Sequence, residues 1–172
     1  MSRRFENLKI TFHMKTPIAL GHPWIHFDGI IAHLLRRQLL GDDYYLQPSK
    51  LPVELDQLLG REEIDPMPLE RYVAGKTFVY RASVSFFEPK QLYLTTIYKR
   101  FHERWSHEIR TKRRYIDTSR GRFRGFMIRL PYIPAKRVIF YCRGEKERIE
   151  ELLKGLAGLG KKVAIGFGSF RK

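Results

Sequence analysis

The chain has 172 residues, a length that fits one domain with a single core. Lysine and arginine number 33 against 18 aspartates and glutamates, and this formal net charge of +15 favours a polyanionic partner, above all nucleic acid. No apolar run is long enough to span a membrane and the first residues lack a signal-peptide pattern, so we expect a cytoplasmic protein without a membrane partner.

The first half of the chain contains one clear strand pattern and one clear helix pattern. Residues 8–16, LKITFHMKT, alternate apolar and polar side chains as a half-buried strand does, and a loop follows over 17–27. Asp28 stands at the N-cap position of a helix that stops at Gly41 and carries an apolar stripe of Ile30, Ile31, Leu34, Leu35 and Leu39. Residues 42–75 contain four prolines and predict an irregular connection, whereas 76–87, KTFVYRASVSFF, predict a strand.

The second half repeats this order. Residues 126–142 contain two strand-like runs around Pro131 and Pro134, and a helix opens at Gly144 and Glu145 with apolar Ile149, Leu152, Leu153 and Leu156. A short final strand is predicted in 164–170. Strand, helix, strand, taken twice, predicts an α+β class with a ferredoxin-like (RRM-like) βαββαβ fold, in which two helices cover one face of an antiparallel sheet.

Between the two halves lies a strongly basic segment, residues 98–124, which we interpret as an insertion in a single domain spanning 1–172. It contains ten lysines and arginines against three acids, with aromatic residues interleaved. A solvated charged helix is the alternative, but the acids are too few for i, i+4 neutralisation, and the aromatics offer stacking surfaces to bases. The predicted RNA contacts here are Lys99, Arg100, Arg104, Trp105, Arg110, Lys112, Arg113, Arg114, Tyr115, Arg120, Arg122 and Arg124.

A glycine-rich stretch, GLAGLGKKVAIGFGSF, covers residues 155–170. Gly155, Gly160 and Lys161 fit a Walker A pattern, but Lys162 replaces its Ser or Thr, and the stretch follows a helix instead of opening one. It is therefore not a nucleotide-hydrolysing site. A helix stop with a tight turn is one interpretation, and contact with an RNA phosphate backbone is the one we favour. The predicted contacts are Gly160, Lys161, Lys162, Gly166, Phe167 and Gly168.

The glycine stretch, read as G-x-G-K-K-x-x-x-G-F-G, resembles the hallmark loop of the RAMP superfamily of CRISPR-associated proteins. Residues 17–35, PIALGHPWIHFDGIIAHLL, are similar to a second part of that pattern, a first-strand loop that leads into a helix. In its compact size the chain resembles the Cas5-like branch of this superfamily, and in particular the small forms of type IV or type VII systems. This resemblance implies a subunit without catalysis that caps the 5′ handle of a CRISPR RNA and contacts Cas7-like backbone subunits, with target nucleic acid as a further partner.

Histidines are the candidates for chemistry, since the same superfamily contains members that cut RNA with a histidine. His22 and His26 flank Trp24 in the predicted loop, and we expect all three to contact RNA, whereas His33 is expected to pack in the helix. No pair forms a convincing acid and base. We therefore expect no catalytic residue, no metal and no cofactor. Two alternatives stay open: a metal-independent endoribonuclease that processes CRISPR RNA, and a general RNA-binding protein such as a ribosomal protein.

Overall fold

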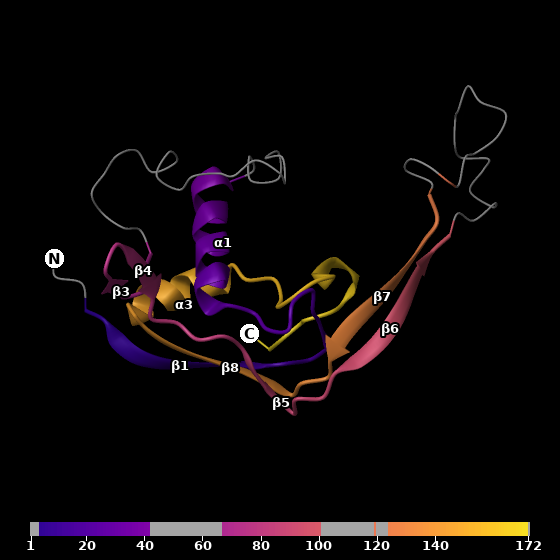
Figure 1. The fold of residues 1–172 in the computed structure, drawn as a ribbon, viewed down its shortest axis with the longest axis horizontal. Coiled ribbons are helices and arrows are strands. Elements are labelled where there is room, and N and C mark those ends of the chain that lie inside the picture. The colour runs from indigo at the N-terminus through magenta and orange to yellow at the C-terminus, as the bar shows by residue number, and fades with distance from the viewer. Residues whose placement is uncertain (1–3, 42–66, 101–118, 120–123, 172) are drawn as a thin grey trace, which may run out of the picture.

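The computed structural model describes residues 4–41, 67–100, 119 and 124–171. The described part has a mixed α/β fold with antiparallel sheets and two α-helices, as the sequence predicted at this level (Figure 1). Its elements are β1 (Glu6–His13), β2 (Ile18–Ala19), α1 (Phe27–Leu40), β3 (Arg71–Ala74), β4 (Thr77–Tyr80), β5 (Phe86–Glu88), β6 (Tyr93–Lys99), β7 (Phe126–Ile133), β8 (Arg137–Gly144), α3 (Lys146–Lys154) and a 3-10 helix, η4 (Val163–Ile165).

The core lies between the sheet β1-β8-β5 and the two helices. β1 and β8 pair along their whole length, from Glu6 opposite Gly144 to His13 opposite Arg137. Alternate residues of each strand therefore point toward α1 and α3, and a cluster of buried side chains fills the space between. Phe140 stands at its centre, with the ring of Phe12 5.9 Å away and that of Phe27 5.3 Å away.

Helix α1 begins one residue before the predicted cap. Phe27 is the first helical residue and His26 occupies the N-cap with an extended backbone, so the assignment of Asp28 to the cap was wrong. Burial of Phe27 against Phe140 fixes the start of the helix, and Asp28 accepts a hydrogen bond from the Gly29 N–H at 2.9 Å within the first turn. The apolar stripe is buried except for Leu39, which is 46% exposed in a final turn that projects away from the sheet (Figure 1).

The single strand predicted over 76–87 is wrong. Residues 77–80 form β4, which pairs with β3 across a turn at Gly75, and only residues 86–88 join the main sheet as β5. The intervening residues stay irregular because they carry the chain from the hairpin to the sheet, where Ser83 donates its N–H to the Tyr141 carbonyl at 2.8 Å. β3 also falls in the stretch predicted to be irregular, of which residues 42–66 lie outside the described part.

A long two-stranded ribbon, β6–β7, was only half predicted. Its pairs run from Tyr93 opposite Tyr132 to Lys99 opposite Phe126, and β7 also pairs with β2. The ribbon projects away from the sheet (Figure 1). The basic segment thus begins at the end of a strand that the sequence pattern did not predict, and residues 101–118 and 120–123 lie outside the described part.

The end of the chain is not the predicted strand. Helix α3 stops at Lys154, earlier than expected, and residues 163–165 form η4. Positive φ angles at Gly166 (97°) and Gly168 (70°) are incompatible with an extended strand. The predicted strand is reduced to a single β-bridge between Phe170 and Met14. Two backbone hydrogen bonds, from the Lys15 N–H to the Ser169 carbonyl and from the Arg171 N–H to the His13 carbonyl, hold the two segments side by side.

Candidate nucleic-acid interface

The glycine loop, residues 158–168, folds back onto β2 and onto Pro17, the residue before it. Lys161 donates its N–H to the Ala19 carbonyl at 2.7 Å, and Gly168 donates its N–H to the Pro17 carbonyl at 2.8 Å. Inside the loop, Leu159 donates to the Gly168 carbonyl at 2.9 Å. The loop is therefore built by backbone pairing with residues 17–19, more than a hundred positions earlier in the chain.

The glycines of this loop differ in what surrounds them. A β-carbon on Gly160 would lie 2.5 Å from the Ala19 carbonyl oxygen, and one on Gly168 would overlap the Leu159 carbonyl oxygen, so both glycines permit close approach of the protein's own backbone. Gly166 differs, because a β-carbon there would have no atom within 4 Å. Of the predicted glycine contacts, only Gly166 thus leaves open space for a ligand.

The histidine loop, residues 20–26, lies against the glycine loop. His22, Trp24 and His26 are exposed, and the loop is anchored where Ser85 donates its N–H to the Ile25 carbonyl and accepts the Ile25 N–H through its hydroxyl. The side chain of Lys161 lies across Gly21, where a β-carbon would overlap its Cε and Nζ atoms. Two motifs from opposite ends of the sequence are thus in direct contact.

A pocket of about 410 Å³ separates α1 from the glycine loop. It is lined by Ile25, His26, Gly29, Ile30, His33, Leu156, Gly158, Leu159 and Gly160. The expectation that His33 is a packed residue of the helix was wrong, since its side chain is exposed on α1 and borders this pocket. Partial burial, then the positive charges of Arg37 and Arg36, lower the pKa of His33 below 6.5, which keeps the imidazole neutral near pH 7.

An aromatic row connects the ribbon to the glycine loop. Tyr93 on β6 stacks on Tyr132 of β7 with ring centroids 5.7 Å apart and 27° between planes. Tyr132 lies 6.4 Å from Phe167 of the glycine loop. Sequence reasoning named Phe167 but missed both tyrosines. The aromatic and β-branched residues of 93–97, YLTTI, were the signal that could have revealed the strand and placed Tyr93 on it.

The base of the basic segment continues this surface. Lys99 Nζ lies 5.7 Å from the ring centre of Phe126, and the Arg100 guanidinium lies 5.7 Å from that of Tyr98. Lys99, Arg100 and Arg124 are the predicted contacts of this segment that the structure describes. The other predicted contacts of this segment lie outside the described residues and are Arg104, Trp105, Arg110, Lys112, Arg113, Arg114, Tyr115, Arg120 and Arg122.

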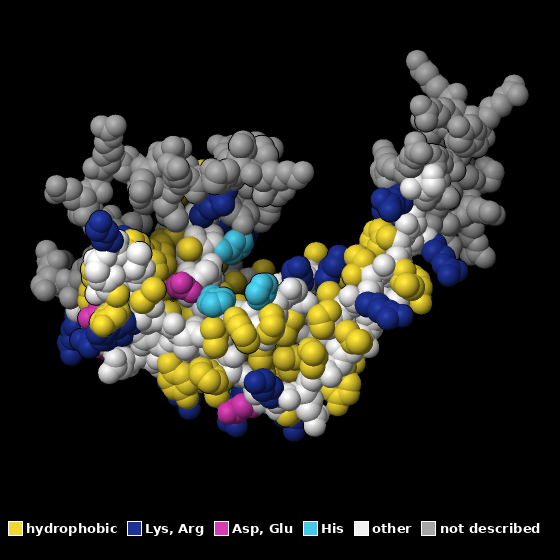
Figure 2. Space-filling model, viewed as in Figure 1, with side chains coloured by type: hydrophobic (Ala, Val, Ile, Leu, Met, Phe, Trp, Pro, Cys, Tyr) yellow, Lys and Arg dark blue, Asp and Glu magenta, His cyan; other side chains and the backbone are white. Residues whose placement is uncertain are grey.

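Figure 2 shows how these parts meet. Histidine side chains gather at the base of a hollow between α1 and the β6–β7 ribbon, and lysines and arginines lie along the ribbon. Within the described ranges, no three His, Cys, Asp or Glu side chains stand close enough to hold a metal ion. Neither helix that the structure describes is long and apolar enough to cross a bilayer.

Comparison with known proteins agrees with the resemblance seen in the two motifs. A search of curated proteins finds no match. Residues 6–172, nearly the whole chain, match the family described as CRISPR type IV associated protein Csf3. The match includes β1, the histidine loop and the glycine loop. The chain belongs to the Csf3 family, the Cas5-like subunits of type IV CRISPR systems.

Proposed function

We propose that this protein is the subunit that binds the 5′ handle of the CRISPR RNA in a type IV effector complex, without cutting it. The observation that carries the proposal is the contact between the glycine loop and the histidine loop at the base of the ribbon, in a chain of the Csf3 family. The neighbouring subunit would be the first Cas7-like backbone protein, and target nucleic acid would pass nearby.

The topology supports a ferredoxin-like core beneath this site. The main sheet runs β1-β8-β5, and the residues around Phe170 lie beside β1 on its other edge. Numbered as core strands in chain order, β1 is 1, β5 is 2, β8 is 3 and the segment around Phe170 is a reduced strand 4, so the order across the sheet is 4-1-3-2. In this order α1 and α3 fall in the positions of the two ferredoxin-like helices. The β6–β7 ribbon is then an insertion between the second and third core strands.

The described residues suggest how the RNA would be held. The amides of Leu159, Lys161 and Gly168 are already paired within the protein, so phosphates would be attracted chiefly by the side chains of Lys161 and Lys162. Both lysines are exposed. Bases would stack on the row formed by Tyr93, Tyr132 and Phe167, which is the usual way in which single-stranded RNA is recognised.

A double substitution, Lys161→Ala with Lys162→Ala, tests the charge contribution. Removing one lysine–phosphate pair should flatten the slope of log K against log salt by about 0.7, so we expect a change of about 1.4 on handle RNA. Lys76→Ala is the matched control, since Lys76 is an exposed lysine at the β3–β4 turn, away from the hollow. An unchanged slope in the double variant would reject the glycine loop as a phosphate-binding element.

Metal-independent RNA cleavage is the second candidate, because His26 and His33 border one pocket and the lowered pKa of His33 leaves its imidazole neutral. A neutral imidazole can accept the 2′-hydroxyl proton, and a second group must then protonate the leaving oxygen. Repeat RNA incubated with the protein in EDTA separates the two candidates. Cleavage that disappears in both His26→Ala and His33→Ala would favour this candidate, whereas intact RNA would favour binding alone.

A further inference from the structure

The face of the β1-β8-β5 sheet opposite the helices carries a second group of exposed side chains. Leu8 and Ile10 pack toward the core, so strand alternation places Asn7 and Lys9 on the outer face. On β8, Cys142 belongs to the core whereas Tyr141, one position earlier, is 47% exposed. This surface lies on the other side of the sheet from α1 and α3, so it is separate from the pocket between α1 and the glycine loop.

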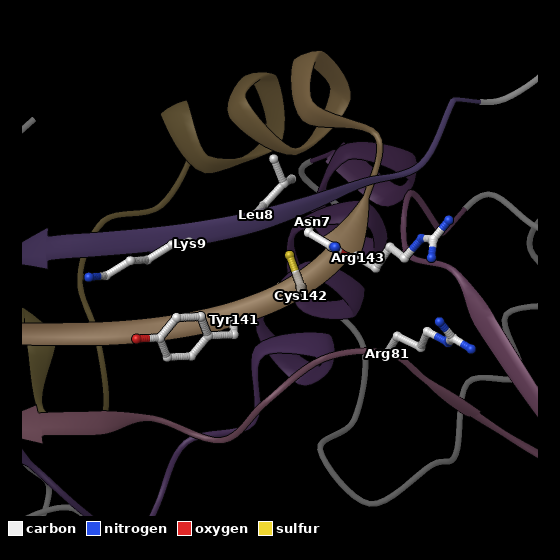
Figure 3. Close-up of a pocket in the computed structure, with 7 residues that line it drawn as sticks. All are labelled: Asn7, Leu8, Lys9, Arg81, Tyr141, Cys142 and Arg143. Atoms are coloured by element: carbon white, nitrogen blue, oxygen red, sulfur yellow. The ribbon is translucent and has the colours of Figure 1, made fainter.

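A shallow pocket of about 460 Å³ marks this face, lined by Asn7, Leu8, Lys9, Arg81, Tyr141, Cys142 and Arg143. Figure 3 shows the two guanidinium groups at one end of it and Tyr141 with Lys9 at the other. The side chain of Asn7 lies between them and offers an amide that both donates and accepts hydrogen bonds.

Two further aromatic rings extend this pocket. Phe86 on β5 is 49% exposed and packs edge-to-face on Tyr141, with ring centroids 5.7 Å apart. At the other end, Tyr72 of β3 is 53% exposed, and the Arg81 guanidinium lies 5.6 Å from its ring centre. We call this set the outer strip, consisting of Phe86, Tyr141, Lys9, Arg143, Arg81 and Tyr72.

The charges of the outer strip are not balanced. Arg81 and Arg143 both direct Nε to the same carboxylate oxygen of Glu70, at 3.1 and 3.3 Å. One carboxylate thus faces two guanidiniums, and Lys9 adds a further positive charge at the opposite end. The Nη atoms of each guanidinium carry further N–H donors suited to a phosphate.

We propose that the outer strip is a second binding site for single-stranded nucleic acid, on the opposite face of the sheet from the hollow. Aromatic rings lie at both ends of it with the three cations between them, and this combination lets bases stack while phosphates are neutralised. Asn7 would contact the edge of one stacked base. A protein partner is disfavoured because the three cations of the strip, Lys9, Arg143 and Arg81, lie in its middle, whereas the centres of protein interfaces are depleted of charge.

The experiment uses the full chain carrying Lys161→Ala and Lys162→Ala, so that the proposed handle site is weakened. Fluorescent oligo(U) and oligo(dT) of about ten nucleotides serve as probes, since such lengths fill one single-strand site. In this background we expect Tyr141→Ala to weaken binding by about 5- to 150-fold, the effect of removing one stacked base, and Tyr141→Phe to restore it. Lys9→Ala should flatten the salt slope by about 0.7.

Photo-crosslinking gives an independent readout. Oligomers that contain 4-thiouridine or 4-thiothymidine should crosslink to Tyr141 or Phe86, and comparing the two oligomers shows whether RNA or DNA is preferred. The proposal is overturned if crosslinks map only to Tyr93, Tyr132 and Phe167, or if a folded Tyr141→Ala variant binds the oligonucleotides as tightly as its parent does.

If the Tyr141→Ala variant binds the oligonucleotides as its parent does but no longer assembles into the complex, the outer strip is instead a contact surface for a protein partner. Retained crosslinks at Tyr141 after failure of handle binding would leave this proposal standing without the proposed function.

Discussion

The side chain of Lys161 lies across Gly21, so that the glycine loop touches the histidine loop, which follows β2. Gly21 has no positive φ, and the atoms that a β-carbon would meet are the far end of a flexible lysine. The contact therefore matters for the position of the ammonium group more than for the stability of the fold.

Gly21→Ala should displace the Lys161 side chain and weaken RNA binding without a large loss of stability. We expect the free energy of unfolding to change by less than about 1 kcal/mol, because a flexible side chain can move aside. Binding of handle RNA, measured by anisotropy, should fall. Gly155→Ala is the control, since Gly155 ends α3 with a negative φ and the nearest atom to its new β-carbon would be 3.4 Å away. Equal affinities of both variants and the parent would contradict the assigned role of Lys161.

Gly168→Ala should be far more damaging to the fold than Gly166→Ala. Both glycines have positive φ, but only at Gly168 would the new methyl group overlap the Leu159 carbonyl, which must then move. We expect a loss of about 3 kcal/mol or more at Gly168 and about 1–2 kcal/mol at Gly166. Urea denaturation measures both. Gly75→Ala reports the cost of positive φ alone, since that position is also open.

The pKa of His33 should lie below 6.5 in the free protein and rise when RNA binds. Partial burial and the neighbouring Arg37 and Arg36 disfavour the imidazolium, whereas a nearby phosphate would favour it. Since the folded pKa is depressed, the stability contributed by neutral His33 is present above pH 6.5 and is lost as pH falls through the folded value. NMR titration of its ring protons checks both statements. A pKa that RNA leaves unchanged would place the phosphates away from this pocket.

Cys142 should be unreactive in the folded protein. Burial raises the pKa of its thiol to about 11, so almost no thiolate exists near pH 8. The fold favours the neutral thiol, so its contribution to stability is present below pH 9 and is lost as pH rises toward 11. Ellman's reagent should react slowly until urea is added, and Cys142→Ala should show a smaller alkaline loss of stability. Rapid reaction of the native protein would contradict the burial.

Much of the fold could be predicted from local pattern. β1 alternates cleanly, and the stripe of α1 packs as its spacing indicated, apart from Leu39. The errors fell where tertiary contacts override pattern. The glycine loop contains Ala164 and Ile165, which look extended, but its glycines serve backbone pairing with residues 17–19. The stacking of Tyr93 on Tyr132 depends on the register of a ribbon whose strands are separated by the basic segment, and no spacing rule reveals such a pair.

The basic segment should dominate the salt dependence of RNA binding. Changing Arg110, Lys112, Arg113 and Arg114 together to Ala should flatten the slope of log K against log salt by about 2 to 3 units, if most of them contact phosphate. Trp105→Ala or Tyr115→Ala should instead cost about 1–3 kcal/mol of binding and leave the slope nearly unchanged. A quadruple variant with the parent slope and affinity would show that the segment is not an RNA-contacting arm.

Recognition of the 5′ handle of the CRISPR RNA, without cleavage, is the function proposed for this Csf3-family protein. The most direct measurement is a competition assay, in EDTA, between a labelled RNA that begins with the natural handle and the same RNA with its handle scrambled, with RNA length read on a gel afterwards. Recognition by base stacking and edge contacts predicts that the natural handle binds more tightly, that its advantage persists at high salt, and that both RNAs keep their full length. Equal affinity for the two RNAs, or shortening of either one, would contradict the proposal.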